Sequence, residues 1–384
     1  MNIFSDYFSQ LKGKKHKFLS GEYSFAFLVH SRNHRDIYRK YPGLKILPRG
    51  IVLFILKHLW PITVSRVTGL HSTIDAKEVR GYVIGIPMTA DQMMKNQPLA
   101  LRRIRQALYL ARGKGARIVG LGGLTSSLSH GGKELLDIPI NITTGHAYTA
   151  FNVTQNLFKL VEIFNVPKEK LRVAVVGAAG SIGSMSALLV ARQGFLSIVL
   201  IDLQRKHPSL TELEKEIHTL APNCTVTISD NITDISDCDF VITATNTPEA
   251  LVTPDIVRPG MVIIDDAQPS DIHPDVLKMA DVLTIEAGVV STPGVHSNFN
   301  YGLKNRTDNF CCMAELLILA ANHWTDHYVI HRATLRHVDE ISTMGKSLGF
   351  TVASFQNFLE SIPSDKIEHV AALAQKKHLE KHGL

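Results

Sequence analysis

The chain has little of what marks several classes of protein. It holds four cysteines among 384 residues, at positions 224, 238, 311 and 312, and their spacing fits neither a zinc site nor a secreted disulfide framework. Its most apolar segment, residues 50–56, ends at Lys57, far short of the roughly 20 residues that span a bilayer. The N-terminus lacks the charged start and apolar block of a signal peptide, so we expect no export. We therefore expect a cytoplasmic protein with free thiols.

The composition is that of a globular protein with a basic N-terminal third. Hydrophobic residues make up 45% and charged residues 20%, and the length allows two domains. The net charge is +6, and an early cluster holds Lys12, Lys14, Lys15 and Lys17. Three roles remain open for this charge: a solvated face, an acidic partner, or peripheral contact with an anionic membrane. We do not expect nucleic acid as a partner, because no binding motif accompanies the charge.

Residues 173–183 read VAVVGAAGSIG, in which a predicted buried strand runs directly into a glycine turn. Glycines in such a turn let the backbone approach a pyrophosphate on the N-terminus of the next helix. A second predicted strand, residues 197–201, leads into Asp202 about 20 positions after the last glycine, as expected for the acid that binds the adenosine ribose. This context predicts a dinucleotide site, with the phosphates at Gly177, Gly180, Ser181, Ile182 and Gly183.

The strand pattern continues after this motif. With the first two strands, predicted strands near residues 225–228, 240–244, 262–265 and 282–285 make six, the usual complement of a doubly wound parallel sheet of the Rossmann type. Such α/β folds bind ligands at the carboxyl ends of their strands. We therefore expect Ala244 and Thr245 to flank the cofactor, and Gly288 to border its nicotinamide.

Two further segments complete the expected α/β architecture. Residues 1–70 are basic and broken by three prolines into short helices, and strands at 79–84 and 117–121 flank a helix at 89–113. After residue 307 the pattern is helical. We predict an N-terminal α/β substrate domain at residues 1–165, a dinucleotide-binding domain at 166–305, and a C-terminal helical segment at 306–384 that packs back on the substrate domain.

Cys311 and Cys312 lie in the segment RTDNFCCMAEL, residues 306–316. We expect Thr307 or Asp308 to cap the following helix, which places both thiols near its first turn. The unpaired N–H groups there favour an anion, and thiols at helix starts titrate below the usual pKa of about 8.5 and attack as thiolates. The alternative is that both cysteines are small buried hydrophobic residues, as free cysteine often is.

Five blocks, taken in order and spacing, are similar to those of a known family. They are LGGLTS at residues 121–126, TTGHAYT at 143–149, VVGAAGSIGS at 175–184, AGVV at 287–290 and FCCMAE at 310–315. Over residues 75–325 the chain resembles the long-chain acyl-ACP reductases that form fatty aldehydes, and more closely their bacterial acyl-ACP reductase-like relatives.

This resemblance implies an activity. In that family one cysteine takes the fatty acyl group from the carrier's phosphopantetheine thioester, and a nicotinamide hydride then reduces the enzyme thioester to the aldehyde. The family's cysteine falls on Cys312, with Cys311 in place of a small residue. The implied partners are a fatty acyl-carrier protein or acyl-CoA. The family also suggests magnesium, but the sequence shows no ligand cluster, and we predict no metal site.

Attack on a thioester builds negative charge on the carbonyl oxygen, so hydrogen-bond donors near that oxygen speed the reaction. Thr125, Ser126 and Thr144 lie in loops that can supply donors, and His146 can also protonate the departing thiol or the aldehyde oxygen. The alternative for each is that it satisfies backbone at a turn or helix start. We expect Glu315 to be structural, because a carboxylate beside the thiol opposes thiolate formation.

The choice of cofactor is open between NADPH and NADH. The resemblance implies NADPH, for which the family carries a basic residue just after the second strand. Here Asp202 stands at that strand end, and a carboxylate there binds a free ribose diol and repels a 2′-phosphate. Arg205 and Lys206 follow closely enough to reach such a phosphate.

Two other functions fit the same residues. One is a shikimate-dehydrogenase-like oxidoreductase that reduces a small carbonyl without covalent catalysis, which suits the domain order and the ATNTP turn at residues 244–248. The other is a non-catalytic dinucleotide-binding sensor. If the thioester reading holds, we expect the basic N-terminal region and residues 51–56 to receive the acyl chain, its acidic carrier, or both. The oligomeric state is left open.

Overall fold

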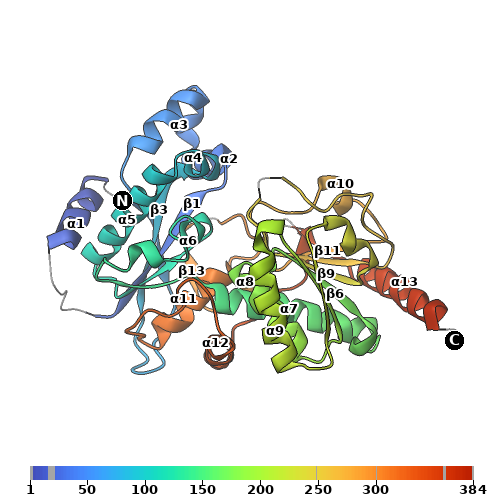
Figure 1. Cartoon of the computed structure of the whole chain (residues 1–384). Coiled ribbons are helices and arrows are strands. Elements are labelled where there is room, and N and C mark those ends of the chain that lie inside the picture. The colour runs from blue at the N-terminus through green and yellow to red at the C-terminus, as the bar shows by residue number, and fades with distance from the viewer. Residues whose placement is uncertain (1–2, 16–21, 248, 300, 358–359, 383–384) are drawn as a thin grey trace. The chain divides into compact units, whose positions relative to one another are not determined.

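The computed structural model describes residues 3–15, 22–247, 249–299, 301–357 and 360–382 (Figure 1). The chain divides into two compact units. The first comprises residues 1–145, 291–331 and 343–350, and the second comprises residues 146–290, 332–342 and 351–384. Each unit is therefore assembled from segments that are far apart in the sequence.

The first unit is built on a six-stranded mixed sheet of order β13-β2-β3-β1-β4-β5. Strand β3 pairs in parallel with β1, β1 with β4 and β4 with β5, whereas β2 runs antiparallel to β3 and β13 antiparallel to β2. The strands are β1 (Ser24–Ser31), β2 (Ile62–Thr68), β3 (Arg80–Thr89), β4 (Ile118–Leu121), β5 (Asn141–Thr143) and β13 (His296–Ser297). The residues that follow β1, β4 and β5 thus meet at one sheet edge.

Helices surround this sheet and fix the position of that edge. They are α1 (Ile3–Lys15), α2 (His34–Lys40), η1 (Pro42–Ile46), α3 (Arg49–His58), α4 (Ala90–Lys95), α5 (Gln97–Gly113), α6 (Leu124–Ser127), η2 (Lys133–Leu135) and α11 (Cys311–Ala321). Helices α1 and α5 cross closely at a glycine, since a Cβ on Gly113 would lie 1.7 Å from the Ser9 carbonyl oxygen. Helix α11 packs on β4, where a Cβ on Gly120 would lie 3.0 Å from Leu316.

Two expectations for this unit need correction. The first 70 residues do form short helices, but they also supply β2 and β1, and β1 lies inside the sheet with Phe25, Ala26 and Leu28 fully buried. The helix expected at residues 89–113 is two helices. Asn96 leaves helical geometry between α4 and α5 and caps α5 by accepting a hydrogen bond from the Leu99 N–H at 3.2 Å.

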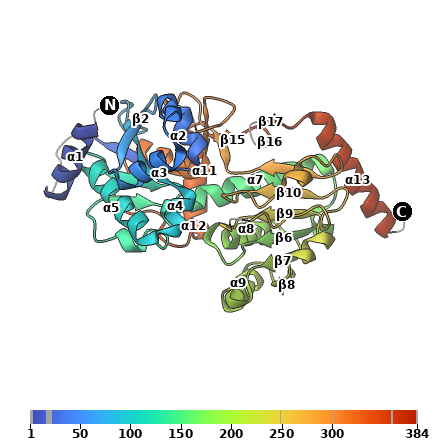
Figure 2. The ribbon, with the colours of Figure 1, turned by 90° about the horizontal axis from the view of Figure 1, so that it is seen from above.

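The second unit holds a six-stranded sheet of order β11-β10-β9-β6-β7-β8, and every pairing in it is parallel. Figure 2 shows β10, β9, β6, β7 and β8 in this order. The strands are β6 (Arg172–Val176), β7 (Ser197–Ile201), β8 (Thr225–Ser229), β9 (Phe240–Thr243), β10 (Val262–Asp265) and β11 (Leu283–Glu286). Numbered from β6, the order is that of the doubly wound dinucleotide-binding fold, so the predicted fold class is confirmed.

The helices of this unit pack on one another as well as on the sheet. Helix α8 packs with α9 against β6, β7 and β8, and α7 packs with both α8 and α13, with α7 near β10 and α13 near β11. The unit's helices are α7 (His146–Phe164), η3 (Lys168–Lys170), α8 (Ser181–Arg192), η4 (Gln204–Lys206), α9 (His207–Leu220), η5 (Ile232–Asp237), α10 (Pro274–Leu277) and α13 (Ser364–His382). None of the helices in the described ranges is both long and apolar enough to cross a membrane.

The C-terminal segment does not pack as one body on the first unit. Helix α11 packs on β1 and β4, but α13 belongs to the second unit, where Gln375 donates to the Phe164 carbonyl at 2.7 Å. Residues of α12 (Leu335–Ser347) are shared between the two units. The segment also contains short strands, so it is not helical throughout: β14 (Asp308–Phe310), β15 (Thr351–Val352), β16 (Gln356–Asn357) and β17 (Glu360–Ser361), which follow β12 (Val289–Ser291).

Candidate functional site

Cys311 and Cys312 are the first two residues of α11. The residue before them, Phe310, is the N-cap, and its side chain makes no capping hydrogen bond. Cys311 is buried, whereas Cys312 is partly exposed. The first N–H groups of a helix lack partners within the helix and favour an anion nearby. Of the two thiols, Cys312 therefore combines this position with access to a reactant.

The cap expected from Thr307 or Asp308 is wrong. The Thr307 carbonyl accepts hydrogen bonds from the N–H and the hydroxyl of Thr292, at 2.8 and 2.9 Å. Asp308 begins β14 and accepts a hydrogen bond from the Asn305 amide at 2.9 Å. Because residues 308–310 are extended, the N-cap is Phe310, two or three residues after the expected cap, and the helix begins directly at the cysteines.

Gly145 touches Cys312. A Cβ built on Gly145 would lie 2.3 Å from the Cys312 Cβ and 2.4 Å from its Cα, and the glycine has a φ of +81°. No side chain fits there, and L-residues rarely adopt that backbone conformation. The chain that leaves β5 therefore passes directly beside the thiol-bearing residue.

Glu315 ties β5 to α11. Its carboxylate is fully buried and accepts hydrogen bonds from the Thr143 hydroxyl and, at 3.1 Å, from the Gly145 N–H. The expectation of a structural role is confirmed by these bonds. Glu315 holds the peptide of Gly145 against the helix that starts with the cysteines.

Thr144, the residue before Gly145, has a buried hydroxyl. The residue is 1% exposed, and its Oγ1 has no hydrogen-bond partner among the described residues. Its N–H donates to the Val329 carbonyl at 3.2 Å, which fixes the backbone. A buried hydroxyl without a partner is costly, so it is a natural position for a donor that serves a bound ligand. Thr144 immediately precedes the glycine that touches Cys312.

In the loop after β4, unlike at Thr144, side chains are engaged in hydrogen bonds with the backbone. The Thr125 hydroxyl donates to the Gly122 carbonyl at 2.9 Å, so it is engaged with the backbone. Ser126 is buried within α6. His30, which lies near the end of β1, accepts the Leu124 N–H at Nε2 (3.1 Å) and donates from Nδ1 to the Ser31 carbonyl (3.2 Å), and its burial lowers its pKa. His30 is therefore a neutral support for this loop.

His146 is the first residue of α7, as expected, and is partly exposed. It follows Gly145 directly and begins the second unit.

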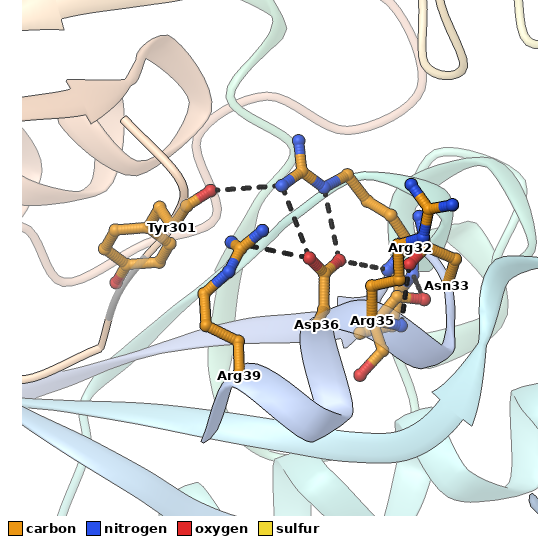
Figure 3. A network of polar contacts seen from close by, with 8 residues as sticks. Arg32, Asn33, Arg35, Asp36, Arg39 and Tyr301 are labelled. Atoms are coloured by element: carbon orange, nitrogen blue, oxygen red, sulfur yellow. Dashed lines mark hydrogen bonds and ion pairs between the residues drawn. The ribbon is translucent and has the colours of Figure 1, made fainter. Parts of the chain in front are cut away.

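A cationic cluster that sequence reasoning missed lies in the first unit (Figure 3). Arg32 and Arg39 both pair with Asp36, at 3.2 and 3.5 Å, and Arg32 also donates to the Tyr301 carbonyl at 3.4 Å. Burial raises the pKa of the Tyr301 phenol, and the charge of Cys312 raises it further. The phenol donates to the Met313 sulfur at 3.2 Å. The run RNHRDIYRK at residues 32–40, with four basic side chains and one acid, was the available signal.

The glycine turn of the second unit forms a cradle that only glycine fits. Gly177 has a φ of +79°, and a Cβ there would lie 2.7 Å from the Ala244 carbonyl oxygen. A Cβ on Gly183 would lie 2.3 Å from the Gly177 carbonyl oxygen. Gly180 is the N-cap of α8 and offers no side-chain bond to the open N–H groups. The turn, with Ser181 and Ile182 opening the helix, therefore fits a pyrophosphate.

Asp202 follows β7 and binds this turn. Its carboxylate accepts the Ala179 N–H at 2.9 Å and the Leu203 N–H at 2.8 Å. Arg205 and Lys206 follow in η4, and both are exposed. The glycine turn also has a neighbour that the sequence did not indicate. Ala333, about 150 residues further along the chain, donates its N–H to the Ser181 hydroxyl at 3.3 Å.

The other expected cofactor residues lie at the carboxyl ends of β9 and β11. Ala244 and Thr245 follow β9, and Gly288 comes two residues after β11. Thr245 donates its hydroxyl to Asp271 at 2.6 Å, and a Cβ on Gly288 would lie 2.7 Å from the Asp266 carboxylate. Acidic side chains therefore line this end of the sheet.

Comparison with known proteins agrees with this geometry. Residues 171–250 match the model of the lactate/malate dehydrogenase NAD-binding domain. The second unit therefore carries an NAD-binding domain of the dehydrogenase type, and NAD(H) is its cofactor class. Among the described residues, no group of three or more His, Cys, Asp or Glu side chains is arranged to hold a metal ion.

Curated proteins and solved structures are similar to the chain, among them the following three. Aminotransferase PigE from Serratia sp. strain ATCC 39006 is 27% identical in an alignment of 298 residues that covers 75% of this chain. The chain spans about a third (34%) of that relative's length. An NAD-dependent malic enzyme from Thermotoga maritima is 12% identical with a TM-score of 0.40, covering 92% of this chain and 84% of that one. Quinate dehydrogenase from Corynebacterium glutamicum, solved with NAD, is 13% identical with a TM-score of 0.31, covering 63% and 80%.

Proposed function

We propose that this chain is an NAD(P)H-dependent oxidoreductase that reduces a long-chain fatty acyl thioester to the fatty aldehyde through an acyl group carried on Cys312. The donor is a fatty acyl-carrier protein or acyl-CoA. The observation that carries the proposal is the position of Cys312. This partly exposed cysteine lies in the first turn of α11 and against Gly145, and the residue before that glycine, Thr144, has a buried hydroxyl with no partner among the described residues.

The chemistry balances in two steps. The Cys312 thiolate attacks the thioester carbonyl, a new carbon–sulfur bond forms, and the carrier leaves as its thiol after taking a proton. When bound, the reduced nicotinamide supplies a hydride for the carbonyl carbon. The Cys312 thiolate then leaves, which releases the aldehyde.

The residues of the first unit have distinct roles in this proposal. Donors at the carbonyl oxygen stabilise its developing charge in both steps, and the buried Thr144 hydroxyl is suited to this. Glu315 positions Gly145 and so the peptide beside the thiol. His146 is the candidate proton donor to the departing carrier thiol. Thr125 and Ser126 shape the neighbouring loop.

The similarity to PigE is consistent with an aldehyde product. That relative is named an aminotransferase, and about two thirds of its length lies outside the match. An aminotransferase adds an amino group to a carbonyl carbon, so a carbonyl-forming reductase is a chemically sensible companion for one.

Exposed apolar and basic side chains offer a surface for the acyl donor. On α3, Ile51, Phe54 and Ile55 are about half exposed or more, and their spacing puts them on one helix face. Phe4 and Phe8 of α1 are also exposed, and Lys12 and Lys14 follow them. An apolar face beside basic residues suits a fatty chain delivered by an acidic carrier or a membrane surface.

A second function is favoured by the family match. The matched model is that of a lactate/malate dehydrogenase domain, which favours a carbonyl or alcohol oxidoreductase that works without a covalent intermediate. In that reading Cys312 is a small side chain at a helix start, and the substrate is a small carbonyl compound, as in shikimate-dehydrogenase-like enzymes.

Acylation without cofactor separates the two functions. We expect the protein, incubated with palmitoyl-CoA or a palmitoyl carrier protein and no nicotinamide, to gain one acyl mass that maps to Cys312. Cys312→Ser should lose the adduct, and Cys311→Ser is the matched control that should keep it. An acyl mass on Cys311 or elsewhere would contradict the proposal. No adduct, together with cofactor-dependent reduction of a small carbonyl, would establish the second function instead.

A further inference from the structure

Three aspartates gather at the carboxyl ends of β9, β10 and β11. The last paired positions of these strands align Thr243, Asp265 and Glu286 side by side. Asp266 follows directly, and its N–H donates to the Thr243 carbonyl at 2.9 Å. Asp271 lies on the loop beyond and accepts the Thr245 hydroxyl. We call Asp265, Asp266 and Asp271 the acidic cluster.

The fold assigns this end of the sheet to the nicotinamide. The strand order reverses between β6 and β9, and a dinucleotide lies across that point with one half on each side. Asp202 at β7 marks the adenosine half, so the strands β9, β10 and β11 receive the nicotinamide half. Asp266 borders Gly288, and Asp271 binds Thr245, and both partners were expected to line the cofactor.

The carboxyl groups of the acidic cluster are not neutralised by a basic side chain among the described residues. Asp265 is satisfied by the hydroxyls of Thr243 and Ser270 and by the Ala267 N–H. The fully buried Asp271 leaves its Oδ2 without a partner in the described part of the chain. Among the described residues, no basic side chain forms an ion pair with any of the three aspartates, and the charged groups facing Asp266 are Asp265 and Glu286.

Burial and mutual repulsion hold protons on this cluster near neutral pH. Burial raises the pKa of Asp271 to about 7, with Asp265 adding to the rise. Burial, Asp265 and Glu286 raise the pKa of Asp266 well above its usual range. Burial also raises the pKa of Asp265. The number of negative charges beside the nicotinamide half therefore changes as the pH passes through neutrality.

We propose that the acidic cluster distinguishes the redox states of the bound cofactor: it binds the cationic ring of NAD⁺ more tightly when the cluster is ionised than when it is protonated, and it binds the neutral ring of NADH equally in both states. The physical cause is charge. A pyridinium ring placed in a buried site gains from each carboxylate beside it, whereas the dihydropyridine of NADH gains nothing. By linkage, binding of NAD⁺ expels a proton from the cluster. In acid the oxidised cofactor therefore leaves more easily, which favours turnover in the reducing direction.

Cofactor binding to the full chain, without any acyl substrate, tests this proposal. Kd for NADH is measured by its fluorescence and Kd for NAD⁺ by calorimetry, from about pH 5.5 to about pH 8.5. We expect affinity for NAD⁺ relative to NADH to rise with pH, by up to about tenfold per pH unit for each proton released. Calorimetry in buffers of different ionisation enthalpy should detect that proton when NAD⁺ binds.

ADP-ribose is the matched probe, because it has the adenosine and pyrophosphate but no nicotinamide ring. Its Kd should not follow the pH dependence seen for NAD⁺. Asp271→Asn and Asp266→Asn keep an acceptor oxygen, and unchanged binding of ADP-ribose shows that each variant is folded. Each should flatten the pH dependence of the NAD⁺ affinity and leave the NADH affinity within about twofold.

Three results would overturn the proposal. One is an NAD⁺ to NADH affinity ratio that is constant across this pH range in the unaltered chain. Another is an equal pH dependence for ADP-ribose, and the third is a wild-type profile in both variants. Since no acyl donor is used, none of these results bears on whether Cys312 is acylated.

Discussion

The backbone of Gly145 lies against Cys312 so closely that a Cβ at position 145 would fall 2.3 Å from the cysteine Cβ. This relationship joins the end of β5 to the start of α11, and Glu315 holds it by accepting the Gly145 N–H. A chain that leaves one strand thus fixes the surroundings of a thiol about 170 residues later. The first prediction tests this contact.

Gly145→Ala should abolish thiol-dependent activity. The new methyl group must push Cys312 or the β5 loop aside, in addition to the strain of about 1–2 kcal/mol that an L-residue pays in left-handed geometry. Gly349→Ala is the matched control, because Gly349 has a φ of +74° but nothing within 4 Å of an added Cβ. Thermal unfolding and iodoacetamide labelling of Cys312 measure the effects. Equal behaviour of the two variants would contradict a specific contact.

Thr144→Val should lower turnover without lowering stability. Its hydroxyl has no partner among the described residues, so its loss removes only a donor to the reacting oxygen, which is expected to cost about 10²–10³ in kcat. Thr125→Val is the matched variant. Its hydroxyl donates to the Gly122 carbonyl, so that change should cost about 0.5–1.5 kcal/mol of stability instead. Steady-state kinetics and denaturant unfolding of both variants would show the contrast, and a Thr144 variant with normal kcat would remove the donor role.

Asp202→Asn should weaken NADH binding more than NADPH binding. The carboxylate accepts the Ala179 N–H. An acid at this strand end is expected to bind a free ribose diol and to repel a 2′-phosphate. Replacing both Arg205 and Lys206 by alanine should do the reverse and weaken only NADPH. Fluorescence titration with both reduced cofactors measures these affinities. A large preference of the unaltered chain for NADPH would refute the ribose role of Asp202.

Reversal of charge at Lys12, Lys14 and Lys15 to glutamate should weaken turnover with an acyl-carrier protein but not with acyl-CoA. An acidic carrier loses its electrostatic attraction, which acts mainly on the association rate and fades with salt. The two donors are compared at equal acyl chain length and at low and high ionic strength. Equal losses with both donors would point to a role of this region in folding.

The second unit should become more stable on mild acidification. Burial raises the pKa of Asp271 to about 7, whereas an unfolded aspartate titrates near 3.9, so the folded state binds more protons between these values. Its contribution is present in full below the unfolded pKa and is lost as the pH rises through about 7, by at most about 1.4 kcal/mol per unit. Urea unfolding of the wild type and of Asp271→Asn measures the difference. An identical pH profile in the variant would exclude Asp271 as the source.

Local pattern alone was enough for the dinucleotide-binding unit. Its strands are short buried runs, its glycines stand where a turn must approach a phosphate, and Asp202 follows at the expected spacing. The six strands and the confirmed fold class follow from features that neighbours along the chain supply. The first 70 residues were harder, because β1 is recognisable only once β3 and β4 pair with its two edges and the helices α5 and α11 pack on it.

The surroundings of the candidate functional groups depend on segments that are far apart in the sequence, so only the tertiary structure determines them. The sequence indicated two thiols near a helix start, but only packing shows that Cys312 is the accessible one, that Gly145 touches it and that Glu315 holds that glycine in place. Likewise nothing in the sequence distinguishes Asp265, Asp266 and Asp271 from other aspartates. Burial beside one another at the ends of β9, β10 and β11 makes them proton-binding groups, because desolvation and charge repulsion act through space and not along the sequence.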